Sequence, residues 1–155
     1  MDFLAANEIC EWAAQRGLQR TTGFAIQLPE LEPHSRRVYA NGRRSGLEAT
    51  AARDLVDVLG EWDECLVWIT LWGVWASGED WPEFYAWRGS LGERRSLDAA
   101  PGHRFDKDEV AQLTRLLELV MNNGWDADVL CSCDGNARRL RAKISHDEWY
   151  QLLGS

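Results

Sequence analysis

Cys131 and Cys133 are the residues whose spacing comes nearest to a metal site. Side chains two residues apart on a β-strand point to the same face of the sheet, so the two thiols could bind a soft metal or oxidise together. His146, further along the chain, is the third candidate ligand. A closed zinc site takes four ligands, usually from CxxC-type pairs. Because only three awkwardly spaced candidates are present, we favour packed thiols and predict no metal and no cofactor.

His103 and Asp80 are the candidate catalytic residues. His103 follows a Pro-Gly pair in a segment, 93–104, that we predict to be an irregular loop, and Asp98 and Asp106 are near it in sequence. A histidine beside carboxylates can act as a general base near neutral pH. The alternative roles are a solvated or turn-stabilising histidine and a helix-capping aspartate. The motifs GxSxG, HExxH, GxGxxG, the P-loop and the EF-hand are all absent, which counts against the common motif-bearing enzymes.

An aromatic segment supplies the candidate binding residues. Several indoles lie where an apolar stretch ends and a predicted helix begins, and they could wall a groove for a planar, cationic or sugar-like ligand. The alternative is that the same rings form the core between strand and helix, as apolar spacing usually does. The candidate ligand- or partner-binding residues are Trp75, Asp80, Trp81, Tyr85 and Arg88.

The stretch CLVWITLWGVWA, residues 65–76, positions these residues. Val, Ile, Thr and Trp favour strands, and neither face of the strand they would form is polar. A strand that is apolar on both faces needs cover on both, so we predict a central Trp-rich strand over about 65–75. A membrane span needs about 20 apolar residues, more than this stretch holds.

The flanking signals predict an α+β domain. Capping residues and apolar spacing predict about five helices packed on the sheet. A turn at Asp134-Gly135 predicts a C-terminal hairpin over 126–144, in a register that pairs Asp128 with Arg141 and Asp126 with Lys143. We therefore expect a single domain, 1–155, with a mixed or antiparallel sheet. The predicted helices are 3–16, 45–59, 80–91, 106–122 and a short one from 145, and two further predicted strands are 23–28 and 35–40.

The net charge of −8, with a pI of about 4.9, constrains the partner. Nucleic acid is disfavoured as the main partner, because phosphate binding needs positive charge. The acidic balance suits either a partner with a basic surface or simple solubility. The N-terminal residues MDFLAANE lack the features of a secretory signal, so we expect a cytoplasmic protein with free thiols and no membrane association.

The sequence is compatible with two functions, and with a third possibility, a domain that serves only a structural role. The first is a non-catalytic, acidic protein-binding or accessory module of immunity type in the bacterial cytoplasm, which engages a basic partner through carboxylates and exposed aromatic side chains. The second is a small enzyme or small-ligand-binding protein that uses the groove from Trp75 to Arg88. The nine tryptophans, the charge and the lack of a catalytic motif favour the first.

Overall fold

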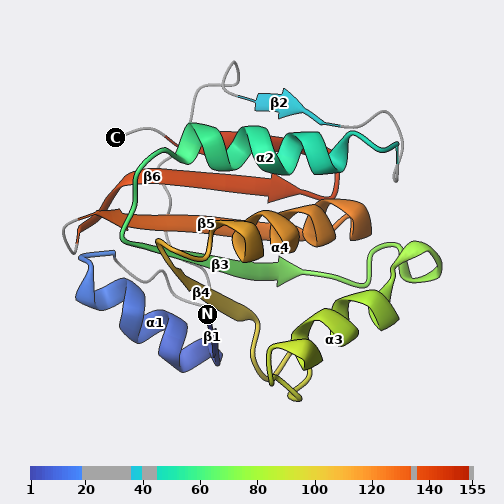
Figure 1. The fold of residues 1–155 in the computed structure, drawn as a ribbon, viewed down its shortest axis with the longest axis horizontal. Coiled ribbons are helices and arrows are strands. Elements are labelled where there is room, and N and C mark those ends of the chain that lie inside the picture. Colours follow the sequence, from blue (N-terminus) through green and yellow to red (C-terminus); the bar gives the residue numbers. More distant parts are fainter. Residues whose placement is uncertain (19–35, 40–44, 134–135, 154–155) are drawn as a thin grey trace.

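One antiparallel sheet organises the fold. The computed structural model describes residues 1–18, 36–39, 45–133 and 136–153. Within these ranges seven strands pair antiparallel in the order β1-β4-β3-β5-β6-β7-β2 (Figure 1). This confirms the α+β class and decides between the mixed and antiparallel alternatives. The strands are β1 (Asp2–Leu4), β2 (Arg36–Val38), β3 (Glu64–Leu71), β4 (Gly102–Asp106), β5 (Asp126–Cys133), β6 (Asn136–Ser145) and β7 (Trp149–Leu153).

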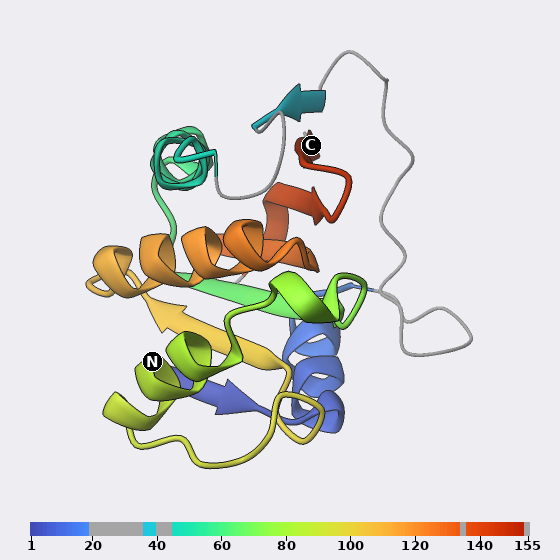
Figure 2. The ribbon, with the colours of Figure 1, turned by 90° about the vertical axis from the view of Figure 1, so that its right-hand side faces the viewer.

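Helices cover both faces of the sheet (Figure 2). The described residues form four α-helices: α1 (Ala6–Gln15), α2 (Glu48–Leu59), α3 (Trp81–Ser90) and α4 (Val110–Asn123), with a 3-10 turn, η2, at Ala76–Gly78. Helix α1 packs through Ile9 and Trp12 onto Leu66 and Trp68 of β3. Helices α2 and α4, together with Phe84 of α3, pack on the opposite face. The apolar side chains therefore form two clusters, separated by the sheet.

The central strand is confirmed, but it is shorter than predicted. β3 pairs with β4 on one side and β5 on the other, and residues 65–69 are buried. The strand ends at Leu71, four residues before the predicted boundary, and the chain then turns at Gly73, whose φ is +78°. Trp72 and Trp75 consequently lie beyond the sheet, and of the three tryptophans in this stretch only Trp68 is a strand residue.

Two short strands replace other predicted structure. Asp2–Leu4, predicted to begin the first helix, instead forms β1, and the predicted loop 93–104 ends in β4. β1 pairs with β4 so that Phe3 lies opposite His103. Helix α1 begins only at Ala6, where the Glu8 carboxylate accepts a hydrogen bond from the Ala5 amide (2.7 Å). Partial burial of Phe3 on the sheet removes apolar area from water that a helix start would leave exposed.

The predicted fifth helix is wrong, because the chain after residue 145 forms β7. Ser145 and Glu148 match a capping box, but Glu148 adopts a φ of +64° and closes a three-residue turn between β6 and β7. A left-handed residue at the end of a three-residue hairpin loop is a common arrangement. Tyr150 then buries its ring in the core opposite Ile144.

The β5–β6 hairpin is confirmed, with a different register. Asp128 lies opposite Lys143 rather than Arg141, because the pairing shifts between Cys131 and Cys133. Such a shift is a β-bulge, which moves every later pair along the strand. Of the other predicted elements, strand 35–40 is confirmed as the shorter β2. Strand 23–28 and the turn at 134–135 lie outside the described residues.

None of the described helices combines the length and the apolar character needed to cross a membrane.

Gly102 fixes how closely α1 approaches the sheet. A Cβ atom built at Gly102 would lie 2.6 Å from Cγ1 and 2.8 Å from Cδ1 of Ile9, and 3.1 Å from Cβ of Leu4. Ile9 is itself fully buried, so it has little room to move away. The glycine thus allows β4 and α1 to pack in direct contact.

We expect Gly102→Ala to lower the free energy of unfolding by about 1–3 kcal/mol, because it overpacks this contact. Gly89→Ala is the matched control: Gly89 lies in α3, a Cβ atom there would meet no other atom within 4 Å, and alanine should raise stability by about 0.5–1 kcal/mol. Urea denaturation of both variants measures the difference. Equal effects at the two positions would contradict close packing at Gly102.

Candidate functional site

The structure divides the predicted groove residues between two environments. Trp81 stacks on Tyr85, with ring centroids 5.7 Å apart and planes at 23°, and its ring centroid lies 4.8 Å from that of Trp125. Asp80 caps α3 by accepting a hydrogen bond from the Glu83 amide (3.1 Å). Trp75 lies before η2 and is 45% exposed. Asp80, Trp81 and Trp75 are therefore neighbours along the start of α3 and the loop before it.

Arg88 lies on the buried side of α3, away from that group. Its side chain is 0% exposed and forms no ion pair with any described residue. Its Nη1 donates to the carbonyl of Ala100 (3.2 Å) and its Nη2 to the carbonyl of Arg95 (3.3 Å). The guanidinium carbon lies 5.0 Å from the Phe3 ring centroid and 5.3 Å from that of Phe84. Arg88 thus holds the loop before β4 against α3, and aromatic faces partly balance its charge.

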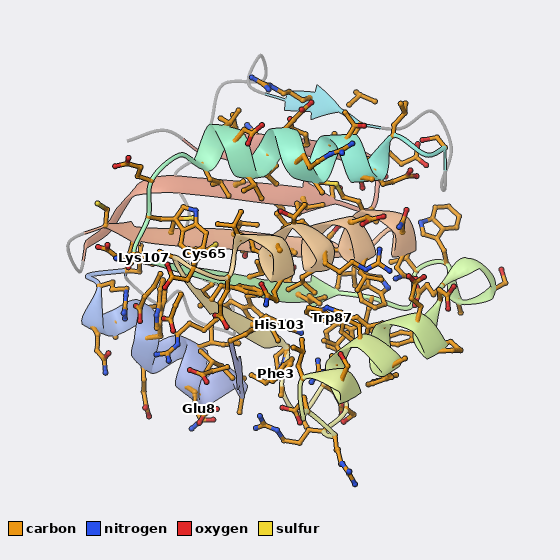
Figure 3. The ribbon with its side chains drawn as sticks, viewed as in Figure 1. Phe3, Glu8, Cys65, Trp87, His103 and Lys107 are labelled. Atoms are coloured by element: carbon orange, nitrogen blue, oxygen red, sulfur yellow. The ribbon has the colours of Figure 1, made fainter. Side chains whose placement is uncertain are left out.

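His103 completes this buried centre. Its Nε2 lies 3.3 Å from Nη1 of Arg88, and rings from three residues surround it, Phe3, Phe84 and Trp87. Figure 3 shows Phe3 and Trp87 approaching His103 from β1 and α3. Burial, and then the charge of Arg88, lower the pKa of His103 to about 3. A neutral His103 can accept a hydrogen bond from the guanidinium, whereas a general base must exchange protons with substrate or solvent. With 0% exposure, His103 reaches neither in this structure.

The candidate metal ligands do not come together. Cys131 is buried opposite Cys65, with the two Sγ atoms 3.3 Å apart, and burial raises the pKa of the Cys65 thiol well above its ordinary value. Cys133 is half-buried beyond the bulge. His146 lies at the other end of the hairpin, where its Nδ1 is 2.8 Å from Oδ1 of Asp126. Across the described ranges, no group of three or more His, Cys, Asp or Glu side chains is arranged to hold a metal ion.

The starts of α2 and α3 and the end of α4 all lie toward the right-hand side of Figure 1. Residues from these three helix ends line an acidic pocket. It has a volume of about 270 Å³. The starts of α2 and α3 contribute three carboxylates, and the end of α4 contributes two asparagine side chains. The lining residues are Gly46, Glu48, Asp80, Glu83, Asn122 and Asn123.

Hydrogen bonds hold this pocket in shape. Glu48 is 1% exposed, and its two carboxylate oxygens accept from the amides of Ser45 (2.9 Å) and Gly46 (2.8 Å). Asn123 is fully buried; its Oδ1 accepts from the Asp80 amide and its Nδ2 donates to the Leu119 carbonyl (2.8 Å). The pocket is thereby built from residues that are fixed before any ligand arrives.

Charge in the pocket is net negative. Glu83 pairs with Arg115, which offsets one of the three carboxylates. The starts of α2 and α3 add about half a positive charge each, and the end of α4 adds about half a negative charge. The sum remains on the order of one to two negative charges, so the pocket attracts a cationic group.

No sequence signal indicates this pocket, although its capping residues are evident. Asp80 caps α3 as its sequence indicates, whereas Glu48 is the first residue of α2 and binds the amides of Ser45 and Gly46 before the helix, so each carboxylate already has a structural role. That both carboxylates face one pocket depends on how α2, α3 and α4 pack, and no local pattern carries that information.

Asp128 is a second residue whose properties only the structure reveals. It lies between Trp68 of β3 and Lys143 of β6. The pKa of Asp128 is raised to about 6, chiefly by burial; the charge of Lys143 opposes this shift and that of Asp126 adds to it. Desolvation of the carboxylate therefore outweighs its electrostatic attraction to the neighbouring lysine.

Comparison with protein-family models, with curated proteins and with solved structures finds no match to this chain. What the protein does must therefore be inferred from the geometry of these sites.

We expect His103 to make the protein less stable as the pH falls below about 6.5. The unfolded chain binds a proton to this histidine near pH 6.5, whereas the folded protein binds one only near pH 3. Stability due to His103 is therefore full above 6.5 and declines toward pH 3, with a slope approaching about 1.4 kcal/mol per pH unit. Urea denaturation from pH 4 to 8 should show that His103→Gln, which keeps a hydrogen-bond acceptor, lacks this slope. A parallel pH dependence in the two proteins would show that His103 is protonated in the fold.

Asp128 should give a pH dependence of stability with the opposite sign to that of His103. Its folded pKa of about 6 lies above the unfolded value near 3.9, so its contribution is full below pH 3.9 and is lost as the pH rises through 6. Asp128→Asn should therefore be more stable than the wild type above pH 7, by about 1–3 kcal/mol, and nearly equal to it at pH 4. The same denaturation series measures this, and a less stable variant at pH 8 would mean that the Lys143 pairing dominates.

Proposed function

We propose that this chain is a non-catalytic protein-binding module, of the accessory or immunity type, that engages a partner with a basic surface. The observation that carries the proposal is the acidic pocket at the ends of α2, α3 and α4, adjoined by a loop with exposed apolar side chains. The proposed contact residues are Trp75 and Asp80 from the predicted set, with Glu83; the buried Glu48 adds negative charge from beneath the pocket. Trp81 stacks on the partly exposed Tyr85 beside these residues, and Arg88 stabilises the fold.

The distribution of charge supports this assignment. Of the 25 acidic residues, 17 lie between residues 45 and 128, together with only 7 of the 17 basic ones. This segment contains α2, α3 and α4, whose ends form the pocket. Clustered carboxylates attract a basic partner from a distance and speed its association.

Exposed aromatic and apolar side chains next to the pocket supply apolar surface that a partner can bury, which the carboxylates do not provide. Leu71, Val74 and Trp75 are each 40–45% exposed in the segment that leads from β3 to Asp80. Trp and Tyr side chains that become buried on binding carry much of the energy of protein interfaces. An arginine or lysine of the partner can enter the pocket while apolar neighbours cover Trp75. Arginine suits the site better, because its guanidinium also stacks on indoles.

Selection from a displayed random-peptide library tests this proposal even while the partner is unidentified. We expect enrichment of peptides with arginine or lysine next to apolar residues, and binding that weakens as salt is raised. Trp75→Ala should lower the affinity for the selected peptides by about tenfold or more, and Glu83→Gln should lower it by about threefold.

The control variant is Asp57→Asn, which removes a carboxylate from the exposed side of α2 away from the pocket. It should leave peptide affinity within about twofold of the wild type, since it changes only long-range attraction. Enrichment of acidic or purely apolar peptides would contradict the proposal, as would equal losses for Trp75→Ala and Asp57→Asn.

A further inference from the structure

A second cavity lies at the end of β3 and shares no lining residue with the acidic pocket. Its volume is about 220 Å³, and it opens between the start of α1, the end of β3 and the loop that precedes β4. In Figure 2 this is the region where the first residues of α1 meet that loop. The residues that matter for its chemistry are Trp68, Thr70, Trp72, Asp98, Pro101 and Ala6.

Two indoles and one carboxylate dominate the lining. Trp68 is held rigidly in β3, where it is 5% exposed, and Trp72 is half-buried just after the strand. Asp98 lies at the exposed rim of the cavity, and a hydrogen bond from the Ser96 side chain lowers the pKa of its carboxyl. Indole faces and a carboxylate both attract positive charge. The combination selects for a cation.

The start of α1 is the group that opposes this selection. Its partial positive charge reaches the cavity through Ala6. Glu8, in the first turn of α1, offsets that charge, since its carboxylate accepts a hydrogen bond from the Ala5 amide (2.7 Å). Lys143, on the same face of the sheet as Trp68, lies opposite Asp128. The charge of Asp98 is therefore left largely uncompensated.

The kind of cation follows from the hydrogen-bond acceptors. A guanidinium brings five N–H donors and a primary ammonium brings three, and each donor that faces an indole wall, away from solvent and from any acceptor, costs free energy. Asp98 and the Thr70 hydroxyl are the acceptor side chains among the lining residues, and the Pro101 carbonyl already accepts from the Ile69 amide (3.1 Å). A quaternary ammonium has no N–H donor and spreads its charge over methyl groups that contact indole faces.

We propose that this cavity binds a small organic cation with a quaternary ammonium head. The volume is below the roughly 300–1,000 Å³ of sites for larger ligands, which suits a single head group. Trp68 and Trp72 contact the methyl groups, and Asp98 supplies the counter-charge. The site is separate from the acidic pocket and does not depend on the function proposed for that pocket.

Choline and its uncharged isostere 3,3-dimethyl-1-butanol distinguish recognition of charge from recognition of shape. We expect choline to shift the indole N–H signal of Trp72 in NMR spectra of the full chain, in a saturable manner with a millimolar dissociation constant. The alcohol should bind at least about tenfold more weakly, because it loses the cation–π and carboxylate attraction. Trp68 also lines the cavity and keeps its indole in every variant, so its indole N–H signal reports on binding when Trp72 is replaced. Followed at that signal, Trp72→Leu should abolish saturable choline binding, and Asp98→Asn should weaken it by about three- to tenfold.

Trp75→Leu is the matched control, since it removes an indole from the same loop without altering the cavity lining. It should leave choline affinity unchanged. Equal affinity for choline and the alcohol would reduce the site to an apolar pocket and overturn the proposal. Absence of a saturable shift at Trp72 would also overturn it, as would loss of binding in Trp75→Leu but not in Trp72→Leu. Circular dichroism spectra that match the wild type establish that each variant is folded.

Discussion

The arrangement of this protein depends on one constraint, which is that β3 is apolar on both faces. Cys65, Val67 and Ile69 point to one side of the sheet, and Leu66 and Trp68 to the other. Each face must be removed from water, at about 25 cal/mol per Å² of apolar surface. Helix α1 covers one face and α4 the other, and β4 and β5 pair with both edges of the strand. The sheet order and the two helical layers follow from this requirement.

The same constraint explains where the candidate sites lie. Apolar sequence continues past the end of β3, so indoles extend beyond the part of the sheet that helices cover. Trp68 remains in the sheet, Trp72 lies against the smaller cavity, and Trp75 is exposed in the loop before η2. The transition from core to surface is therefore made by one continuous segment. The interpretation of these tryptophans as core holds for Trp68, and the exposed one, Trp75, leaves room for the binding interpretation.

Local signals predicted the helices well because helix ends are satisfied by near neighbours in sequence. Asp80 caps α3, and Gly17 with Leu18 ends α1 as its sequence indicates. Prediction of the short strands failed because their partners are far away in sequence. β1 has three residues, too few to show a periodicity, and it exists because Phe3 pairs opposite His103, a hundred residues away. His103 itself was predicted in a loop because polar side chains in a strand usually face solvent, whereas here Arg88 and three aromatic rings enclose it.

Under the proposed function, the carboxylates of the acidic pocket would have a structural role and a binding role at once. Glu48 and Asp80 occupy the starts of α2 and α3, where negative charge stabilises a helix, so fold stability alone explains their presence. The packing of the helices then brings both helix starts together, so that their negative charges lie around one pocket. Trp75 differs, because it is nearly half exposed and its side chain caps no helix. Charge at such a surface mainly raises the rate of encounter, while a buried aromatic side chain mainly prolongs the complex. Among the exposed apolar side chains of the described residues, Trp75 is the largest, and under the proposed function a partner would remove it from water.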